Sequence, residues 1–268
     1  MAIKAIKVKK NLNYIMKCFF GVPIGIILSL YGIVYHAENT EQLLIIGLGG
    51  MLVSEFPPNI IYFCLCSIVL LSQFTLFGTI INDELQSTSL LVIIRSKSRK
   101  SWIIRQICLV CLLSIIIFTI ITVTIIAMAF IFGIPIHNTI SIIEIMLYLM
   151  VTSGLCNMAF LLLLNLFCIR VGTIISVITI WLIYLVGQAL PAFIQNPFVV
   201  KAYPSTHAIL ALHEIGNASL LYPSFFETTI GGFTPLYSFI YCTVFIILIA
   251  IVYFIIIVKY DFNRQVEN

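Results

Sequence analysis

Six long apolar runs divide this sequence and constrain its fold more than any other feature. They lie roughly at 18–35, 60–81, 107–133, 142–169, 173–194 and 236–258. Each can cross a hydrocarbon layer of about 30 Å as an α-helix. Lipid offers backbone groups no hydrogen-bond partner, and no run has the alternating pattern of a β-barrel. The sequence therefore predicts an all-α integral membrane protein with six transmembrane helices, forming a single domain over residues 1–268.

The composition excludes an ordinary soluble domain. Of the 268 residues, 62% are hydrophobic and 9% are charged, whereas soluble domains carry about 25% charged residues. Six helices and their loops use nearly the whole length, so we expect no separate catalytic domain. The first apolar run has membrane-spanning length, and the polar residues after it make a poor cleavage site. We therefore expect a retained first helix and not a signal peptide.

The positive charges predict the orientation. With six spans, every Lys and Arg except Lys201 falls on one side of the membrane. Cytoplasmic loops collect Lys and Arg, so both termini are expected to be cytoplasmic. The apolar segment 43–53 is too short to span and leads to Pro57-Pro58. We interpret it as interfacial or re-entrant, because a seventh span there would move the basic cluster 95–105 outside.

No metal site or disulfide is expected. The eight cysteines fall within or at the ends of the apolar runs, where a free thiol acts as a small hydrophobic group. In the long outer segment 195–235, Ser205 is expected to cap a helix over 206–215. His207, His213 and Glu214 on that helix do not converge as metal ligands, so we expect solvated interface residues.

The inner loop 82–106 carries the most informative pattern. Asn82 is expected to cap a short amphipathic helix, with Asp83 and Glu84 in its first turn complementing the helix dipole. A basic break at 95–101 follows, and Trp102 is expected at the membrane interface where the third span begins. This segment is either a positively charged lipid anchor or a docking element for a cytoplasmic partner.

The pattern in this loop resembles ABC-2-type transporter permeases. That family has an acidic residue, small polar residues, a Leu-Leu pair, a Ser-Arg turn and a Lys opening the next helix. The matching residues here are Asp83, Glu84, Ser87, Thr88, Leu90, Leu91, Ser98, Arg99 and Arg105. Lys97 stands where a proline is frequent, and Arg105 replaces the Lys. The layout of six spans, with a tight inner turn at Arg170 and a long outer segment 195–235, is also similar.

The resemblance implies half of a transporter in a bacterial cytoplasmic membrane. Such a permease pairs with a second, identical or homologous permease and with cytoplasmic ABC ATPase subunits, surrounded by membrane lipid and without nucleic acid. The implied ATPase-coupling residues are Asp83, Glu84, Leu85, Ser87, Thr88, Leu90, Leu91 and Arg99. The sequence has no Gly-x-x-x-x-Gly-Lys-Ser/Thr loop, so ATP and Mg are expected on a partner chain and no cofactor on this one. The resemblance also implies that 195–235 is re-entrant and caps the translocation path.

The spans contain few polar residues. We see no carboxylate or histidine near the middle of a span, which argues against an ion-coupled transporter. Asn157, Asn165 and Gln188 either hydrogen-bond between helices or line a substrate path. The expected function is export of an amphipathic peptide, lipid-like molecule or drug, as in bacteriocin or lantibiotic export and immunity. The alternative is a stand-alone immunity or sensor protein that binds a peptide without transport. No constellation of an intramembrane enzyme is present.

Overall fold

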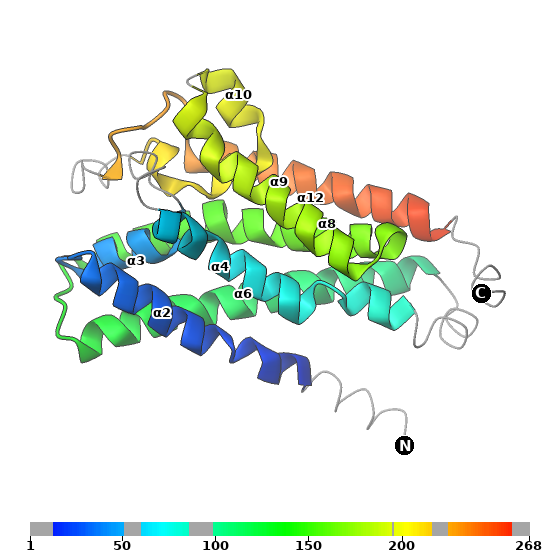
Figure 1. The fold of residues 1–268 in the computed structure, drawn as a ribbon, viewed down its shortest axis with the longest axis horizontal. Helices are drawn as coiled ribbons and strands as arrows, with labels where there is room; N and C mark the ends of the chain where they lie inside the picture. The colour runs from blue at the N-terminus through cyan, green and yellow to red at the C-terminus, as the bar shows by residue number, and fades with distance from the viewer. Residues whose placement is uncertain (1–12, 51–59, 86–98, 195, 216–224, 259–268) are drawn as a thin grey trace.

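The computed structural model describes residues 13–50, 60–85, 99–194, 196–215 and 225–258 (Figure 1). Within these ranges the protein is helical and contains no strand. Six helices are long and apolar enough to cross a membrane, which confirms the predicted number of spans in the described part of the chain. They are Asn13–Val34, Phe63–Leu85, Lys100–Ile131, Ile140–Val171, Thr173–Phe193 and Pro235–Ile256.

The helical elements follow the apolar runs, with short helices added at one end. The long elements are α2 (Gly21–Val34), α4 (Ile60–Phe77), α6 (Arg99–Ile131), α7 (Thr139–Leu149), α8 (Leu155–Val171), α9 (Thr173–Phe193) and α12 (Pro235–Val258). A π-helical turn, η2 (Met150–Gly154), joins α7 to α8. The short elements are α3 (Thr40–Leu48), α10 (Pro197–Ala202) and the 3₁₀ turns η3 (Pro204–Ala208) and η4 (Leu210–Leu212).

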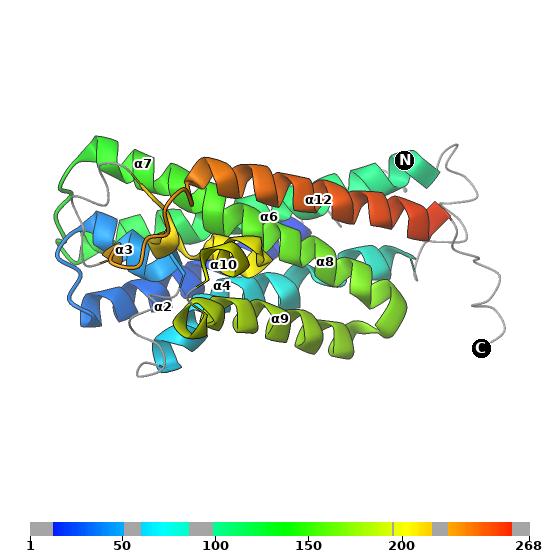
Figure 2. The same cartoon turned by 90° about the horizontal axis from the view of Figure 1, so that it is seen from above.

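The long helices run along one axis of an elongated bundle (Figures 1 and 2). Helix α2 begins, α8 turns into α9 and α12 ends at the same end of the bundle, which we call the inner end. The short helices α3 and α10 lie toward the opposite, outer end (Figure 1). Gly172 separates α8 from α9, which confirms the predicted tight turn after Arg170.

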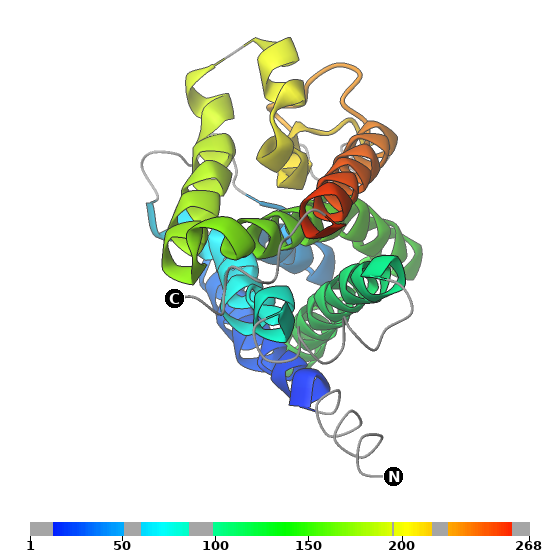
Figure 3. The same cartoon turned by 90° about the vertical axis from the view of Figure 1, so that its right-hand side faces the viewer.

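Helix α8 forms the centre of the bundle. It contacts α4, α6, α9 and α12, and the end-on view shows it between α9 and α12 (Figure 3). The span that contains α8 is 67% buried inside the protein, against 28% for α9 and 17% for α12. Helices α9 and α12 lie at the periphery of the bundle and therefore leave most of their apolar surface to lipid or to another chain.

Two predicted borders at the inner end are wrong. The third long helix begins at Arg99 and not near 107. Arg and Lys are good helix formers, so the helix extends past the apolar run that hydropathy detects. Residues 80–85 are continuously helical, so Asn82 lies within a helical segment and does not begin a new one. The rest of the predicted amphipathic helix, 86–94, lies outside the described residues.

Helix α3 is the described part of the predicted short segment 43–53. It is too short to span, and it is buried among α2, α6 and α7. Asn39 caps its first turn by accepting the N–H of Gln42. The buried carboxylate of Glu41 accepts the N–H groups of Asn138, at 2.9 Å, and of His137, at 3.4 Å. Glu41 thereby ties α3 to the start of α7.

Candidate functional site

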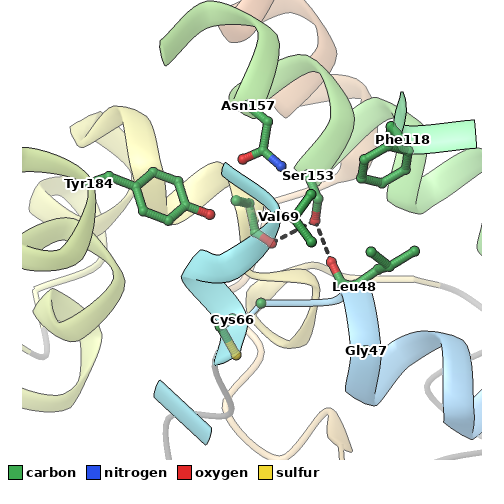
Figure 4. Close-up of a pocket in the computed structure, with 10 residues that line it drawn as sticks. Gly47, Leu48, Cys66, Val69, Phe118, Ser153, Asn157 and Tyr184 are labelled. Carbon is green, nitrogen blue, oxygen red and sulfur yellow. Dashed lines mark hydrogen bonds between the residues drawn. The ribbon is translucent and has the colours of Figure 1, made fainter. Parts of the chain in front are cut away.

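A small polar pocket lies in the interior between α3, α4, α8, α9 and η3 (Figure 4). It has a volume of about 10 Å³, which is close to the room that one water molecule needs. Polar side chains and backbone carbonyls meet there from parts of the chain that are distant in sequence. The lining residues are Gly47, Leu48, Gly50, Cys66, Val69, Phe118, Ser153, Asn157, Tyr184 and Ala208.

The π-helical turn η2 positions Ser153 against the pocket. The wider turn places Thr152 and Ser153 among the buried residues, and such turns recur at functional sites. The hydroxyl of Ser153 lies 2.8 Å from the carbonyl oxygen of Leu48 and 2.9 Å from that of Ala208 (Figure 4). Ser153 thus connects the fourth span to the end of α3 and to η3.

Asn157 lies one turn after Ser153 on the same face of the helix. The side chain is 3% exposed, and its Oδ1 atom has no hydrogen-bond partner within the described residues. Figure 4 shows the amide of Asn157 and the hydroxyl of Tyr184 directed toward the same space. A buried acceptor without a partner is uncommon in proteins, so the pocket is a candidate site for a polar ligand or a water molecule.

The outer segment closes the pocket through backbone contacts. The N–H of Leu210 donates to the carbonyl of Gly49 at 2.6 Å. Gly50 has a φ of +77°, and a Cβ atom there would lie 2.6 Å from the carbonyl oxygen of Ala208. Only glycine allows this backbone to come so close. The turns η3 and η4 therefore pack against the end of α3, and we call the segment 196–215 that contains them the outer cap.

The prediction for the outer histidines is wrong, because His207 and His213 are fully buried. Both imidazoles contact the hydroxyl of Ser238 on α12, at 2.7 Å from His207 Nδ1 and 2.6 Å from His213 Nε2. The remaining nitrogens face backbone carbonyls, which only accept. His207 Nε2 therefore donates to Lys201 O, and His213 Nδ1 donates to Ile209 O.

Aromatic rings enclose the two imidazoles. Tyr241 stacks on His207 with a centroid distance of 4.0 Å, and Phe233 stacks on His213 at 4.2 Å. Burial lowers the pKa of His213 to about 4, and burial together with the neighbouring His213 lowers the pKa of His207 to about 3. Through Ser238 the two imidazoles join the outer cap to the start of α12.

The predicted helix over 206–215 is also wrong. This stretch forms the 3₁₀ turns η3 and η4. The hydroxyl of Thr206 donates to the carbonyl oxygens of Val200 and Tyr203. The two imidazoles donate to two more carbonyls of the same segment, those of Lys201 and Ile209. Side chains that hydrogen-bond to nearby backbone groups compete with helix formation. These contacts and the pairing with α3 override the helical pattern.

The structure separates the three polar residues proposed for a substrate path. Asn157 lines the pocket. Gln188 of α9 donates to the carbonyl of Ser205 in the outer cap at 2.7 Å. Asn165 lies nearer the inner end, fully buried, where its amide bridges α8 to Phe77 and Ile81 of the second span. The predicted interhelical hydrogen bond is therefore confirmed for Asn165.

The described coupling residues Asp83, Glu84 and Leu85 form the last turn of the second span, at the inner end. Thr79 Oγ1 donates to Asp83 at 2.8 Å, and Gln106 Nε2 of α6 donates to Glu84 at 2.8 Å. Leu85 is buried in the core. Ser87, Thr88, Leu90 and Leu91 lie outside the described residues. Arg99 begins α6, but its side chain is not described.

Several central residues were not singled out by the sequence patterns. Ser153 has a signal in hindsight, because Thr152-Ser153-Gly154 is a cluster of small residues inside an apolar run. Tyr184 and Ser238 have none, because their partners come from other helices. All eight cysteines are free thiols. Among the described residues, no three His, Cys, Asp or Glu side chains are grouped as metal ligands.

No family model, curated protein or solved structure matches this chain. The fold and the site define the chain as a multi-pass helical membrane protein with a polar centre.

Proposed function

We propose that this chain is the permease subunit of an ATP-driven ABC exporter that moves an amphipathic peptide, lipid-like molecule or drug. The observation that carries the proposal is the acidic end of the second span. Asp83 and Glu84 follow a long apolar helix and precede a basic cluster, as in ABC-2-type permeases. Their carboxylates are held by Thr79 and by Gln106 of α6, so a force applied there reaches two spans.

In this proposal the inner end of the bundle faces the cytoplasm of a bacterial cell. The described basic residues other than Lys201 belong to segments at this end, which is the side that collects Lys and Arg in membrane proteins. Both termini are then cytoplasmic, and residues 83–94 act as the coupling segment. ATP and Mg bind to a separate ATPase subunit, because the sequence contains no phosphate-binding loop.

The outer cap is the re-entrant segment that closes the path in this proposal. It packs directly over the pocket through Ser153 and Gly50. Opening the path to the outside requires η3 to separate from α3. The substrate then passes between two permeases, and the weakly buried helices α9 and α12 provide apolar surface for a second permease and for lipid.

The first experiment is copurification of the full chain, in detergent or nanodiscs, with the ATPase encoded beside it. We expect a stable complex with ATPase activity. Purification as a homomer that binds a peptide without any ATPase would overturn the exporter proposal and favour a stand-alone immunity or sensor protein.

Charge reversal tests the coupling role directly. We expect the double variant Asp83→Lys, Glu84→Lys to lose ATPase association while it still inserts in the membrane, since like charges now face the partner's binding surface. Glu38→Lys is the matched control, because Glu38 is an exposed acidic residue that belongs to the outer end. If the inner double variant retains the ATPase as well as the control does, the coupling role is wrong.

A further inference from the structure

The second span is interrupted between α4 and its last helical turns. Helix α4 ends at Phe77, a turn occupies Gly78 and Thr79, and helical residues resume over 80–85. In a continuous helix the N–H of Ile81 would donate to the carbonyl of Phe77, four residues earlier. Residues 77–81 are therefore the place where the regular hydrogen-bond ladder of this span is broken.

A side chain from another helix occupies the broken position. The amide of Asn165 on α8 donates from Nδ2 to Phe77 O at 3.0 Å and accepts the N–H of Ile81 at its Oδ1 at 3.1 Å. These are the two backbone groups that a continuous helix would pair with each other. Insertion of a side chain into the ladder is a recognised cause of sharp helix kinks.

Asn165 supplies the bonds to both backbone groups at the interruption. Asn165 is fully buried, and Nδ2 also donates to Leu161 O of its own helix at 3.0 Å. A backbone N–H or carbonyl left without a partner in an apolar interior is strongly unfavourable. The groups at Phe77 and Ile81 therefore have two satisfied arrangements: paired with Asn165 in a bent span, or paired with each other in a straight one.

We propose that residues 77–81 are a hinge with a bent and a straight state, and that Asn165 of α8 selects the bent state. The segment after the hinge carries Asp83 and Glu84, whereas Asn165 lies two turns along α8 from Asn157 at the pocket. Movement of the acidic segment is thus transmitted to the helix that lines the pocket. The hinge itself does not depend on the proposed function. Only the idea that an ATPase moves the hinge rests on that function.

The distance between the hinged segment and α9 reports the state. Spin labels are placed at Asn82 and at Ile174, which is 76% exposed near the start of α9. A ketone-bearing amino acid carries each label, because the chain has eight native cysteines. The full chain is measured in lipid nanodiscs by pulsed electron resonance without any partner.

We expect Asn165→Leu to shift the main distance, because the bent state loses both bonds and its ratio to the straight state falls at least about tenfold. Asn157→Leu is the matched control, a buried asparagine of the same helix that makes no hydrogen bond to the described residues of the second span. Adding Ile81→Pro to Asn165→Leu should restore the bent distance, because a proline ring clashes with the carbonyl four residues earlier.

If Asn165→Leu fails to fold, Asn165→Ser tests whether Asn165 selects the bent state of the hinge. Serine keeps a bond to its own helix and loses both bonds to the second span, so we expect the same shift in distance. An unchanged distance in either folded variant would overturn the hinge. With an ATPase partner, Asn165→Ser should keep ATP hydrolysis but lose transport. If no ATPase associates, the proposed function fails while the distance measurement still tests the hinge.

Discussion

The two ends of this bundle are held together in different ways. At the outer end, the cap is attached through hydrogen bonds of Ser153, the two buried imidazoles and the carbonyl of Gly49, and through the close backbone packing of Gly50. At the inner end, the amide of Asn165 bonds to the two backbone groups at the interruption of the second span, Phe77 O and Ile81 N. The outer cap is therefore held by several contacts, whereas in the proposed hinge one side chain, Asn165, selects the state of the second span.

Among single substitutions that test the difference between the two ends, Gly50→Ala should cause the largest loss in the free energy of unfolding. In Gly50→Ala the new Cβ meets the carbonyl oxygen of Ala208 in a positive-φ backbone, so the cap must move away from α3. We expect a loss of about 3 kcal/mol in the free energy of unfolding, from backbone strain and overpacking together. Thermal unfolding in detergent measures it.

Gly133→Ala is the matched control for this substitution. Gly133 also has a positive φ, of +69°, but no atom lies within 4 Å of the position of a Cβ. It should lose only about 1 kcal/mol, from backbone strain alone. Equal losses in the two variants would mean that the contact between Gly50 and Ala208 contributes nothing to the closure of the cap.

Acid should loosen the outer end selectively. An unfolded histidine has a pKa near 6.5, whereas burial lowers the pKa of His213 to about 4 and that of His207 to about 3. The unfolded chain therefore binds more protons than the folded cap does. The stability present above pH 6.5 is lost as the pH falls toward 4, by about 2 kcal/mol per imidazole at pH 5.

Hydrogen exchange of the cap, measured between pH 7.5 and 5 with correction for the intrinsic rate, tests this expectation. Exchange protection over 196–215 should fall, whereas protection over the inner residues 99–110 should stay. The double variant His207→Gln, His213→Gln lacks both titrating groups and should lose the selective response. Protection of the cap that rises in acid, or falls equally in the double variant, would contradict the burial argument.

The sequence predicted the spans well because an apolar run of sufficient length has one stable arrangement in lipid. It predicted the helix ends poorly, as at Arg99 and Asn82, because hydropathy does not detect a helix that continues beyond the apolar run. The predicted helix 206–215 failed for another reason. His207 and His213 find their shared partner, Ser238, 31 and 25 residues away, and a local pattern contains no information on such contacts.

Two carboxylates allow the smallest and most direct test of the difference between the ends. Glu41 at the outer end is fully buried and accepts two backbone N–H groups, whereas Glu84 at the inner end accepts an amide N–H from Gln106. In Glu41→Gln the new NH₂ group must face one of those N–H donors. We expect a loss of about 1 kcal/mol, the typical result of leaving a buried donor unpaired.

Glu84→Gln keeps an acceptor for Gln106 in a partly exposed site, so its loss in unfolding free energy should stay below about 0.5 kcal/mol. Both variants are isosteric and remove one negative charge, so the comparison separates burial from charge. Thermal unfolding of the two proteins in the same detergent measures the difference. A larger loss in Glu84→Gln than in Glu41→Gln would mean that the inner end is the more rigidly bonded of the two, and the contrast drawn between the ends would be wrong.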